Sequence, residues 1–257
     1  MTEGTEVDFC DDCNTYHLRE DVCPAFPIEQ GREIAPEHRP WTWSHSSTSL
    51  YKECPRKYEI IRWKKEVIEP SGKAAEIGVQ IHEYIEGFLK TGIFPDNLLK
   101  WEKLLRHYHA KDGIAEAAYA FDPNLKRVEP DDPNAWYRGY LDWLKIEGDE
   151  AHVVDWKTGK VKPTKQLALY AWVIFTAHPE VMKVKGTFHW INANDQMSEW
   201  YDRSQLEELF KPYQQVLEAI QLSIDTDTWI ETPGFWCRWC SLTNKHCSNG
   251  RPPEGDF

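Results

Sequence analysis

One tight turn constrains the fold of this chain more than any other feature of the sequence. Strand-like patterns run over residues 136–147 and 150–157, on either side of Gly148-Asp149. A two-residue loop with glycine first is typical of a type II′ hairpin turn. The sequence therefore predicts an antiparallel hairpin in which Leu144 lies opposite Val153.

Two aspartates meet across this hairpin. In the expected register Asp142 lies opposite Asp155, and directly opposed β-carbons are about 4.5 to 5.5 Å apart. Carboxylates this close suit a hard cation such as Mg²⁺ or Mn²⁺, and without one their like charges are destabilising. Lys157 shares the face of Asp155, whereas Trp156 points to the other face. The alternative is a pair of hydrated acids on an exposed strand.

Helical and strand patterns alternate around the hairpin. The expected helices are residues 72–89, 101–108, 163–178 and 204–223, and the further expected strands are 184–191 and 199–202. This order predicts an α/β or α+β fold in which helices pack on a central sheet.

Four cysteines lie near the two ends of this region. Cys54 stands alone, whereas Cys237, Cys240 and Cys247 follow one another as Cys-x2-Cys-x6-Cys. Seven cysteines in 257 residues, grouped at metal-ligand spacings, favour thiolate ligation in a reducing compartment over a disulfide framework. By number, four thiolates fit a [4Fe-4S] cluster or a tetrahedral zinc equally well.

Residues 1–40 are rich in proline, cysteine and acids, and we expect a separate small module or tail there, followed by the main domain over 41–257. A second set of soft ligands lies in this segment: Cys10, Cys13, His17 and Cys23. Their spacing is compatible with a structural zinc knuckle and equally with an unliganded tail.

The charge balance argues against tight nonspecific nucleic-acid binding, because the formal net charge is −12 and phosphate binding needs a lysine and arginine field. One local patch runs against this balance: Lys52, Arg56, Lys57, Arg62, Lys64 and Lys65. The patch is either a DNA track or a solvated helix face. No long apolar run or apolar leader is present, so we expect a soluble, cytoplasmic protein with no membrane partner.

Four short motifs, in this order, resemble the PD-(D/E)xK nuclease superfamily in its RecB-like branch. They are Gly78-x3-His82-x3-Glu86, Gly139-Tyr140-Leu141-Asp142, Asp155-Trp156-Lys157-Thr158-Gly159 and Gln166-x3-Tyr170. Each is weak alone, but their order and separations fit, and only the usual proline before the first aspartate is replaced, by Leu141. The four cysteines add a similarity to the iron-sulfur exonucleases, which include CRISPR-associated RecB-like exonucleases and the nuclease domain of AddB.

The resemblance covers residues 46 to 247 and implies a mixed sheet flanked by helices, with the two ends of the domain joined by a metal cluster. It implies a metal-dependent DNA exonuclease that acts on single strands or frayed ends in recombination, repair or defence. The ligands that the resemblance implies for Mg²⁺ or Mn²⁺ are His82, Asp142, Asp155 and the main-chain carbonyl of Trp156. Lys157 would orient the water or stabilise charge, and Gln166 and Tyr170 would support Lys157. The implied iron-sulfur ligands are Cys54, Cys237, Cys240 and Cys247.

Two other functions remain open. The chain could be a non-catalytic DNA-end binding or scaffold subunit of a recombination complex, or a zinc-stapled interaction domain. The intact set of Asp142, Asp155, Lys157 and Gln166 argues against the first, since a binding module has no need of opposed acids. The second would require the central hairpin to be a coincidence. The sequence has no Gly-x4-Gly-Lys-Ser/Thr phosphate loop, so any unwinding of duplex DNA would come from a helicase or recombination partner.

Overall fold

Two units make up the chain. The computed structural model describes residues 7–10, 15–18, 41–161 and 165–252. The sheet unit comprises residues 42–45 and 70–210, and the cysteine unit comprises the described parts of 1–41, 46–69 and 211–257. No described helix is both long enough and apolar enough to cross a membrane.

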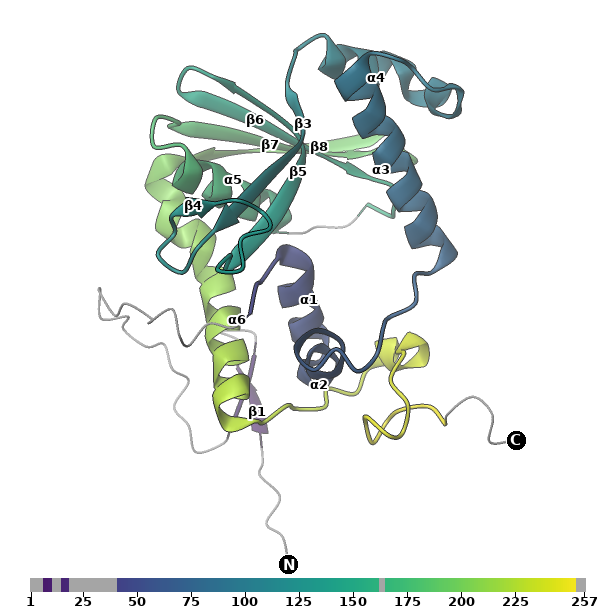
Figure 1. The fold of residues 1–257 in the computed structure, drawn as a ribbon, viewed down its shortest axis with the longest axis vertical. Coiled ribbons are helices and arrows are strands. Elements are labelled where there is room, and N and C mark those ends of the chain that lie inside the picture. The colour runs from purple at the N-terminus through teal and green to yellow at the C-terminus, as the bar shows by residue number, and fades with distance from the viewer. Residues whose placement is uncertain (1–6, 11–14, 19–40, 162–164, 253–257) are drawn as a thin grey trace, which may run out of the picture. The chain divides into compact units, whose positions relative to one another are not determined.

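The sheet unit is built on six strands in the order β4-β3-β5-β6-β7-β8 (Figure 1). The strands are β3 (Ile114–Phe121), β4 (Arg127–Val128), β5 (Tyr137–Glu147), β6 (Glu150–Lys157), β7 (Lys183–Trp190) and β8 (Asp195–Asp202). All neighbours are antiparallel except β6 and β7, which are parallel and connected through helix α5 (Gln166–Ala177). The expected α/β fold, with a mixed sheet and flanking helices, is confirmed.

The hairpin between β5 and β6 has the expected register. Leu144 pairs with Val153 and Glu147 pairs with Glu150. Gly148 has a φ of +62°, whereas Asp149 is not among the residues with positive φ, as a type II′ turn requires. The ladder ends at Trp143 and Val154, one pair short of the two aspartates.

Helices cover both faces of the sheet, as Figure 1 shows. Helix α5 is buried on nearly all sides, which is why its sequence is apolar throughout. The opposite face is covered by α3 (Lys73–Thr91) and α4 (Glu102–His109), whose apolar residues pack against Trp143 and Trp156. Because side chains alternate along a strand, these two tryptophans face away from Asp142 and Asp155. The short helices η3 (Asp96–Trp101) and η4 (Arg203–Gln205) complete the unit.

The cysteine unit is mainly helical. It contains most of α1 (His45–Glu53), α2 (Pro55–Tyr58), the π-helical turn η2 (Glu59–Trp63), most of α6 (Leu206–Thr226) and the short helix η5 (Phe235–Trp239). Pro55 occupies the first turn of α2, where its missing N–H costs nothing. Tyr51 ties α1 to α6, since its hydroxyl lies 2.7 Å from that of Ser223.

The sequence analysis missed some elements. Strands β3 and β4 were not expected, and β3 is rich in alanine, which is not typical of strands. The last strand begins at Asp195 rather than at residue 199. In the first segment the structure describes two short antiparallel strands, β1 (Val7–Cys10) and β2 (Thr15–Leu18).

Candidate active site

Asp142 is held at the end of the β5–β6 ladder by a side-chain contact. Its Oδ2 accepts a hydrogen bond of 2.7 Å from the backbone N–H of Trp156, and this bond replaces the next step of the ladder. The same oxygen lies 3.3 Å from Nδ1 of His82 on α3. Burial opposes protonation of His82, but the hydrogen bond and charge of Asp142 outweigh it and raise the pKa of His82.

Glu116 of β3 joins these two side chains. Donor atoms of His82, Glu116 and Asp142 lie within 4.8 Å of one another, about the spread of ligands around one divalent cation. The β3–β5 register on either side places Glu116 opposite Asp142, and Glu116 has a φ of +52°, a strained backbone for a residue other than glycine. Burial, then the charges of Asp142 and Glu86, raise its pKa. Among the residues described, its carboxylate has no hydrogen bond or ion pair, so it is available to a cation.

The second half of the site is a closed ring of polar contacts between β6 and α5. Tyr170 donates a hydrogen bond of 2.7 Å to Oδ1 of Asp155, and Gln166 donates one of 2.6 Å to the Tyr170 hydroxyl. Lys157 donates a hydrogen bond of 2.8 Å to Oε1 of Gln166, and its Nζ lies 2.7 Å from Oδ2 of Asp155. The ring fixes the position of the lysine ammonium without blocking it, since that side chain stays about one-third exposed.

Asp155 carries an unfavourable charge in this setting. The residue is 2% exposed, and burial together with the charge of Asp142 raises its pKa to about 6, against the lowering effect of Lys157 and Tyr170. Among the described residues its Oδ2 has no hydrogen-bond partner of good geometry, although the Lys157 Nζ lies 2.7 Å away and lowers its pKa. A buried carboxylate with a free lone pair next to a second acid fits a divalent cation, which would lower the pKa again.

The expected arrangement, in which the carboxylates of Asp142 and Asp155 face each other across one ion, therefore differs from the structure in the orientation of the two side chains. Asp142 is turned toward His82 and Glu116, whereas Asp155 is turned toward Lys157 and Tyr170. The two acids still influence each other, because Asp142 contributes to the raised pKa of Asp155.

Gly78 shapes the approach of α3 to this site. A Cβ atom at position 78 would lie 3.0 Å from the hydroxyl oxygen of Thr158, which follows Lys157. The glycine one turn before His82 thus allows the helix to lie against the end of β6, so the Gly78-x3-His82 motif has a packing reason.

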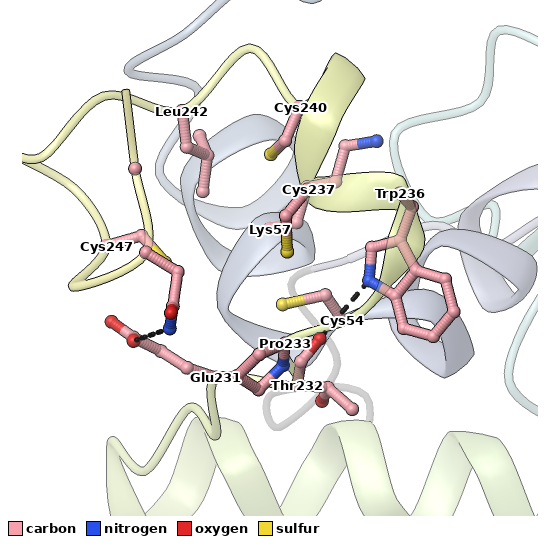
Figure 2. A pocket seen from close by; sticks show the side chains of 12 residues that line it. Cys54, Lys57, Glu231, Thr232, Pro233, Trp236, Cys237, Cys240, Leu242 and Cys247 are labelled. Carbon is pink, nitrogen blue, oxygen red and sulfur yellow. Dashed lines mark hydrogen bonds between the residues drawn. The ribbon is translucent and has the colours of Figure 1, made fainter. Parts of the chain in front are cut away.

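A separate pocket in the cysteine unit gathers the other four candidate ligands. Cys54, Cys237, Cys240 and Cys247 all line it, and none of them forms a disulfide with a described residue. Figure 2 shows the sulfurs of Cys54, Cys237 and Cys240 turned inward, with Cys247 on the facing wall. Burial first, then the charges of neighbouring thiols, raise the pKa of Cys240. The pocket therefore brings the four candidate thiol ligands to one place.

A sequence model of the PD-(D/E)XK nuclease superfamily matches residues 42–244, which include every residue of the candidate active site. The chain belongs to the PD-(D/E)XK nuclease superfamily. The match includes Cys54, Cys237 and Cys240 but ends before Cys247. No curated protein matches this superfamily member in sequence.

Two solved structures are similar to this chain at low sequence identity. A candidate exonuclease from Eubacterium rectale is 12% identical, with a TM-score of 0.49, and the alignment covers 82% of this chain and 92% of that one. The protein SSO0001 is 14% identical, with a TM-score of 0.45 and coverages of 77% and 82%. The superfamily assignment rests on the sequence model and on the residues of the site, not on these likenesses.

The basic patch of this PD-(D/E)XK nuclease is partly neutralised. Lys57 is buried and forms ion pairs with Glu53 at 3.1 Å and Glu69 at 2.7 Å. Arg56 and Lys64 both pair with Glu59, which is 1% exposed. The exposed members are Lys52, Arg62, Lys64 and Lys65.

The N-terminal ligand set lies outside the superfamily match and largely outside the described residues. Cys13 and Cys23 are not described, and only the backbone is described for Cys10 and His17, which lie on β1 and β2. The zinc knuckle stays a prediction.

Glu116 is the site residue that the sequence analysis missed. The only signal for it was a single acid in an alanine-rich stretch, Ala115-Glu116-Ala117-Ala118. An acid surrounded by small apolar residues on a half-buried strand is costly unless it has a partner.

Proposed function

We propose that this chain is a metal-dependent DNA exonuclease of the RecB-like branch, acting on single-stranded or frayed ends. One observation carries the proposal. The ligand atoms of His82, Glu116 and Asp142 lie within 4.8 Å of one another, and beside them a buried Asp155 contacts Lys157. A scaffold protein gains nothing from a buried acid whose pKa is raised to about 6, whereas a cation site does.

The acids and His82 would hold the divalent cation. His82, Glu116, Asp142 and Asp155 supply one nitrogen and several carboxylate oxygens, and the main-chain carbonyl of Trp156 would complete the set. A nitrogen ligand among oxygens favours Mn²⁺ over Mg²⁺ in affinity, although availability in the cell also matters. When bound, the cation supplies a water of lowered pKa and neutralises charge on the phosphate.

Lys157 would act on the attacking water or on the charge that develops at the phosphate. An ammonium is a compact point charge suited to this role. Asp155 and Gln166 fix its position, and the raised pKa of the fully buried Tyr170 keeps the tyrosine a hydrogen-bond donor at neutral pH. Tyr170 and Gln166 are thus positioning residues, while Lys157 and the ligands are catalytic residues.

The cysteine pocket would hold a [4Fe-4S] cluster, with tetrahedral zinc as the alternative. The four thiols come from α2's N-cap, η5 and the segment after it, so a shared metal would join residues far apart in the sequence. Without a metal, burial raises the pKa of Cys240 and Cys247 and keeps both protonated at neutral pH. Metal binding would release these protons and stabilise the cysteine unit.

The exposed basic residues Lys52, Arg62, Lys64 and Lys65 would contribute to DNA binding with bound cations. Because the net charge is −12, we expect binding that falls steeply with salt and that divalent cations strengthen. Unwinding of a duplex would require a helicase or recombination partner.

The test is cleavage of end-labelled DNA by protein purified without oxygen. Wild type is compared with Asp155→Asn and Lys157→Met, with single-stranded DNA, duplex DNA and RNA, and with Mn²⁺, Mg²⁺ or EDTA. The matched controls are Asp149→Asn in the turn of the same hairpin and Lys160→Met just beyond the motif, both at exposed positions.

We expect stepwise release of nucleotides from DNA ends with Mn²⁺, its loss in both site variants, and normal activity in both controls. No cleavage of any substrate by wild type that still binds DNA ends would instead support the scaffold function. Iron and sulfide content distinguishes the cluster from zinc.

A further inference from the structure

Large aromatic side chains stand exposed on η5, directly outside the cysteine pocket. Phe235 is 66% exposed and Trp239 is 65% exposed, although residues of this size are normally packed. Their ring centroids are 4.8 Å apart with planes at 71°, and the Arg238 guanidinium lies 5.0 Å from the Phe235 centroid. We call Phe235, Arg238 and Trp239 the aromatic platform.

The helix that carries the platform is anchored from its other side. Trp236 lines the cysteine pocket and donates a hydrogen bond of 3.2 Å to the carbonyl of Thr232 (Figure 2). A Cβ atom at Gly234 would lie 2.3 Å from the Trp236 ring, so glycine is needed for this packing. Cys237 faces the same pocket. One face of η5 is thus fixed while the platform is left in solvent.

The segment that carries the platform differs in charge from the whole chain. From Thr232 to Pro252 there is no aspartate or glutamate, whereas Arg238, Lys245 and Arg251 are present. None of these three cations forms an ion pair with an acid in the part of the chain that the structure describes. In a chain with a net charge of −12, an acid-free basic segment with exposed rings fits a polyanion that also carries flat apolar groups.

We infer that the aromatic platform binds unpaired bases of single-stranded nucleic acid, with Arg238, Lys245 and Arg251 contacting the phosphates. Every base has a face that stacks on tryptophan or phenylalanine, so such binding is tolerant of sequence, and a duplex offers no unstacked face except at its ends. The inference rests on the proposed nuclease function and names its substrate class, a strand with unpaired bases.

The test measures DNA affinity separately from cleavage. Fluorescence anisotropy is recorded on the whole, anaerobically purified protein with EDTA present, using a labelled oligothymidine, the same strand with abasic residues, and a blunt duplex. The variants are Trp239→Ala and Arg238→Gln. The matched control is Trp200→Ala on β8, an exposed tryptophan that also lies near a cation, 5.9 Å from Lys185, but has acids beside it in the chain.

We expect Trp239→Ala to weaken binding of the thymidine strand by about 5- to 150-fold, the range for loss of one stacked base. It should leave the weaker binding of the abasic strand unchanged, and Trp200→Ala should change neither. Arg238→Gln should lower the salt dependence on both strands. An equal loss on normal and abasic strands, or no loss in Trp239→Ala, would overturn the inference, as would tight binding of a protein partner at this surface with no DNA binding.

The result is independent of the catalytic proposal. Because no divalent cation is present, a protein that never cleaves can still pass or fail this test. If the protein is an active nuclease and Trp239→Ala does not change its DNA affinity, the platform inference fails while the proposed nuclease function stands. Trp239 is exposed, so the variant should fold, and a melting temperature and metal content equal to those of wild type verify that it does.

Discussion

Replacing Asp155 by asparagine should make the free energy of unfolding less dependent on pH. The pKa of this buried acid is raised to about 6 in the folded protein from an ordinary value of 3.8. The folded state therefore holds this proton more tightly than the unfolded state does. Stability from this group is complete below pH 3.8, is lost as the pH rises toward about 6, and stays lost above that.

The difference between 3.8 and about 6 corresponds to about 3 kcal/mol, an upper bound because Asp142 and Lys157 are coupled to the same proton. We expect wild type without divalent cations to lose up to this amount, relative to Asp155→Asn, between pH 4 and pH 6.5. Adding Mn²⁺ at neutral pH should stabilise wild type more than the variant, since the cation favours the ionised carboxylate.

The assay is urea unfolding followed by tryptophan fluorescence, with EDTA or Mn²⁺, at several pH values. Thirteen tryptophans contribute to the signal, and among them Trp143 and Trp156, both 1% exposed, lie in the sheet next to the site. The two proteins have the same cysteines, so contributions of the cysteine pocket cancel in the difference. Asp149→Asn, in the exposed turn, should follow wild type. Parallel pH profiles for wild type and Asp155→Asn in EDTA would refute the raised pKa, and equal stabilisation by Mn²⁺ would refute the role of Asp155 as a ligand.

Three further predictions concern other parts of the molecule. Glu116→Gln should weaken Mn²⁺ binding at least about tenfold in a titration followed by electron paramagnetic resonance, whereas Glu83→Gln at an exposed position of α3 should not. Tyr170→Phe should lower the free energy of unfolding by about 1 to 3 kcal/mol in urea, because Asp155 loses a buried hydrogen-bond donor; an unchanged midpoint would contradict the ring. Cys247→Ser should reduce the iron content and the visible absorption of the protein and lower its melting temperature; full iron retention would exclude this cysteine as a ligand.

The central hairpin could be predicted from sequence because its information is local. Gly148-Asp149 sets the turn, the turn sets the register, and the register places the acids on one face. Likewise, Gln166 and Tyr170 are one helical turn apart, so their common orientation follows from helix geometry alone. For these residues the local sequence is sufficient to predict the relative positions that the structure shows.

Glu116 and the conformation of Asp142 could not be predicted in this way. The position of Glu116 depends on the pairing of β3 with β5, and the alanine-rich sequence of β3 does not announce a strand. The Asp142 carboxylate accepts a hydrogen bond from the Trp156 N–H, which ends the ladder, and it also contacts His82. This orientation depends on α3, which is distant from Asp142 in the sequence. The ion pairs of Arg56 and Lys57 could not be predicted either, because a run of basic residues does not indicate which side chains are buried and paired.

The site combines residues that are close together in the sequence with residues that are far apart, and this has a consequence for folding kinetics. Asp155, Lys157, Gln166 and Tyr170 belong to one strand and the helix that follows it, so their ring needs little of the chain to form. The group of His82, Glu116 and Asp142 requires α3 and two strands to come together, and we expect such long-range contacts to form late in folding. Divalent cations should therefore slow unfolding and leave the refolding rate almost unchanged.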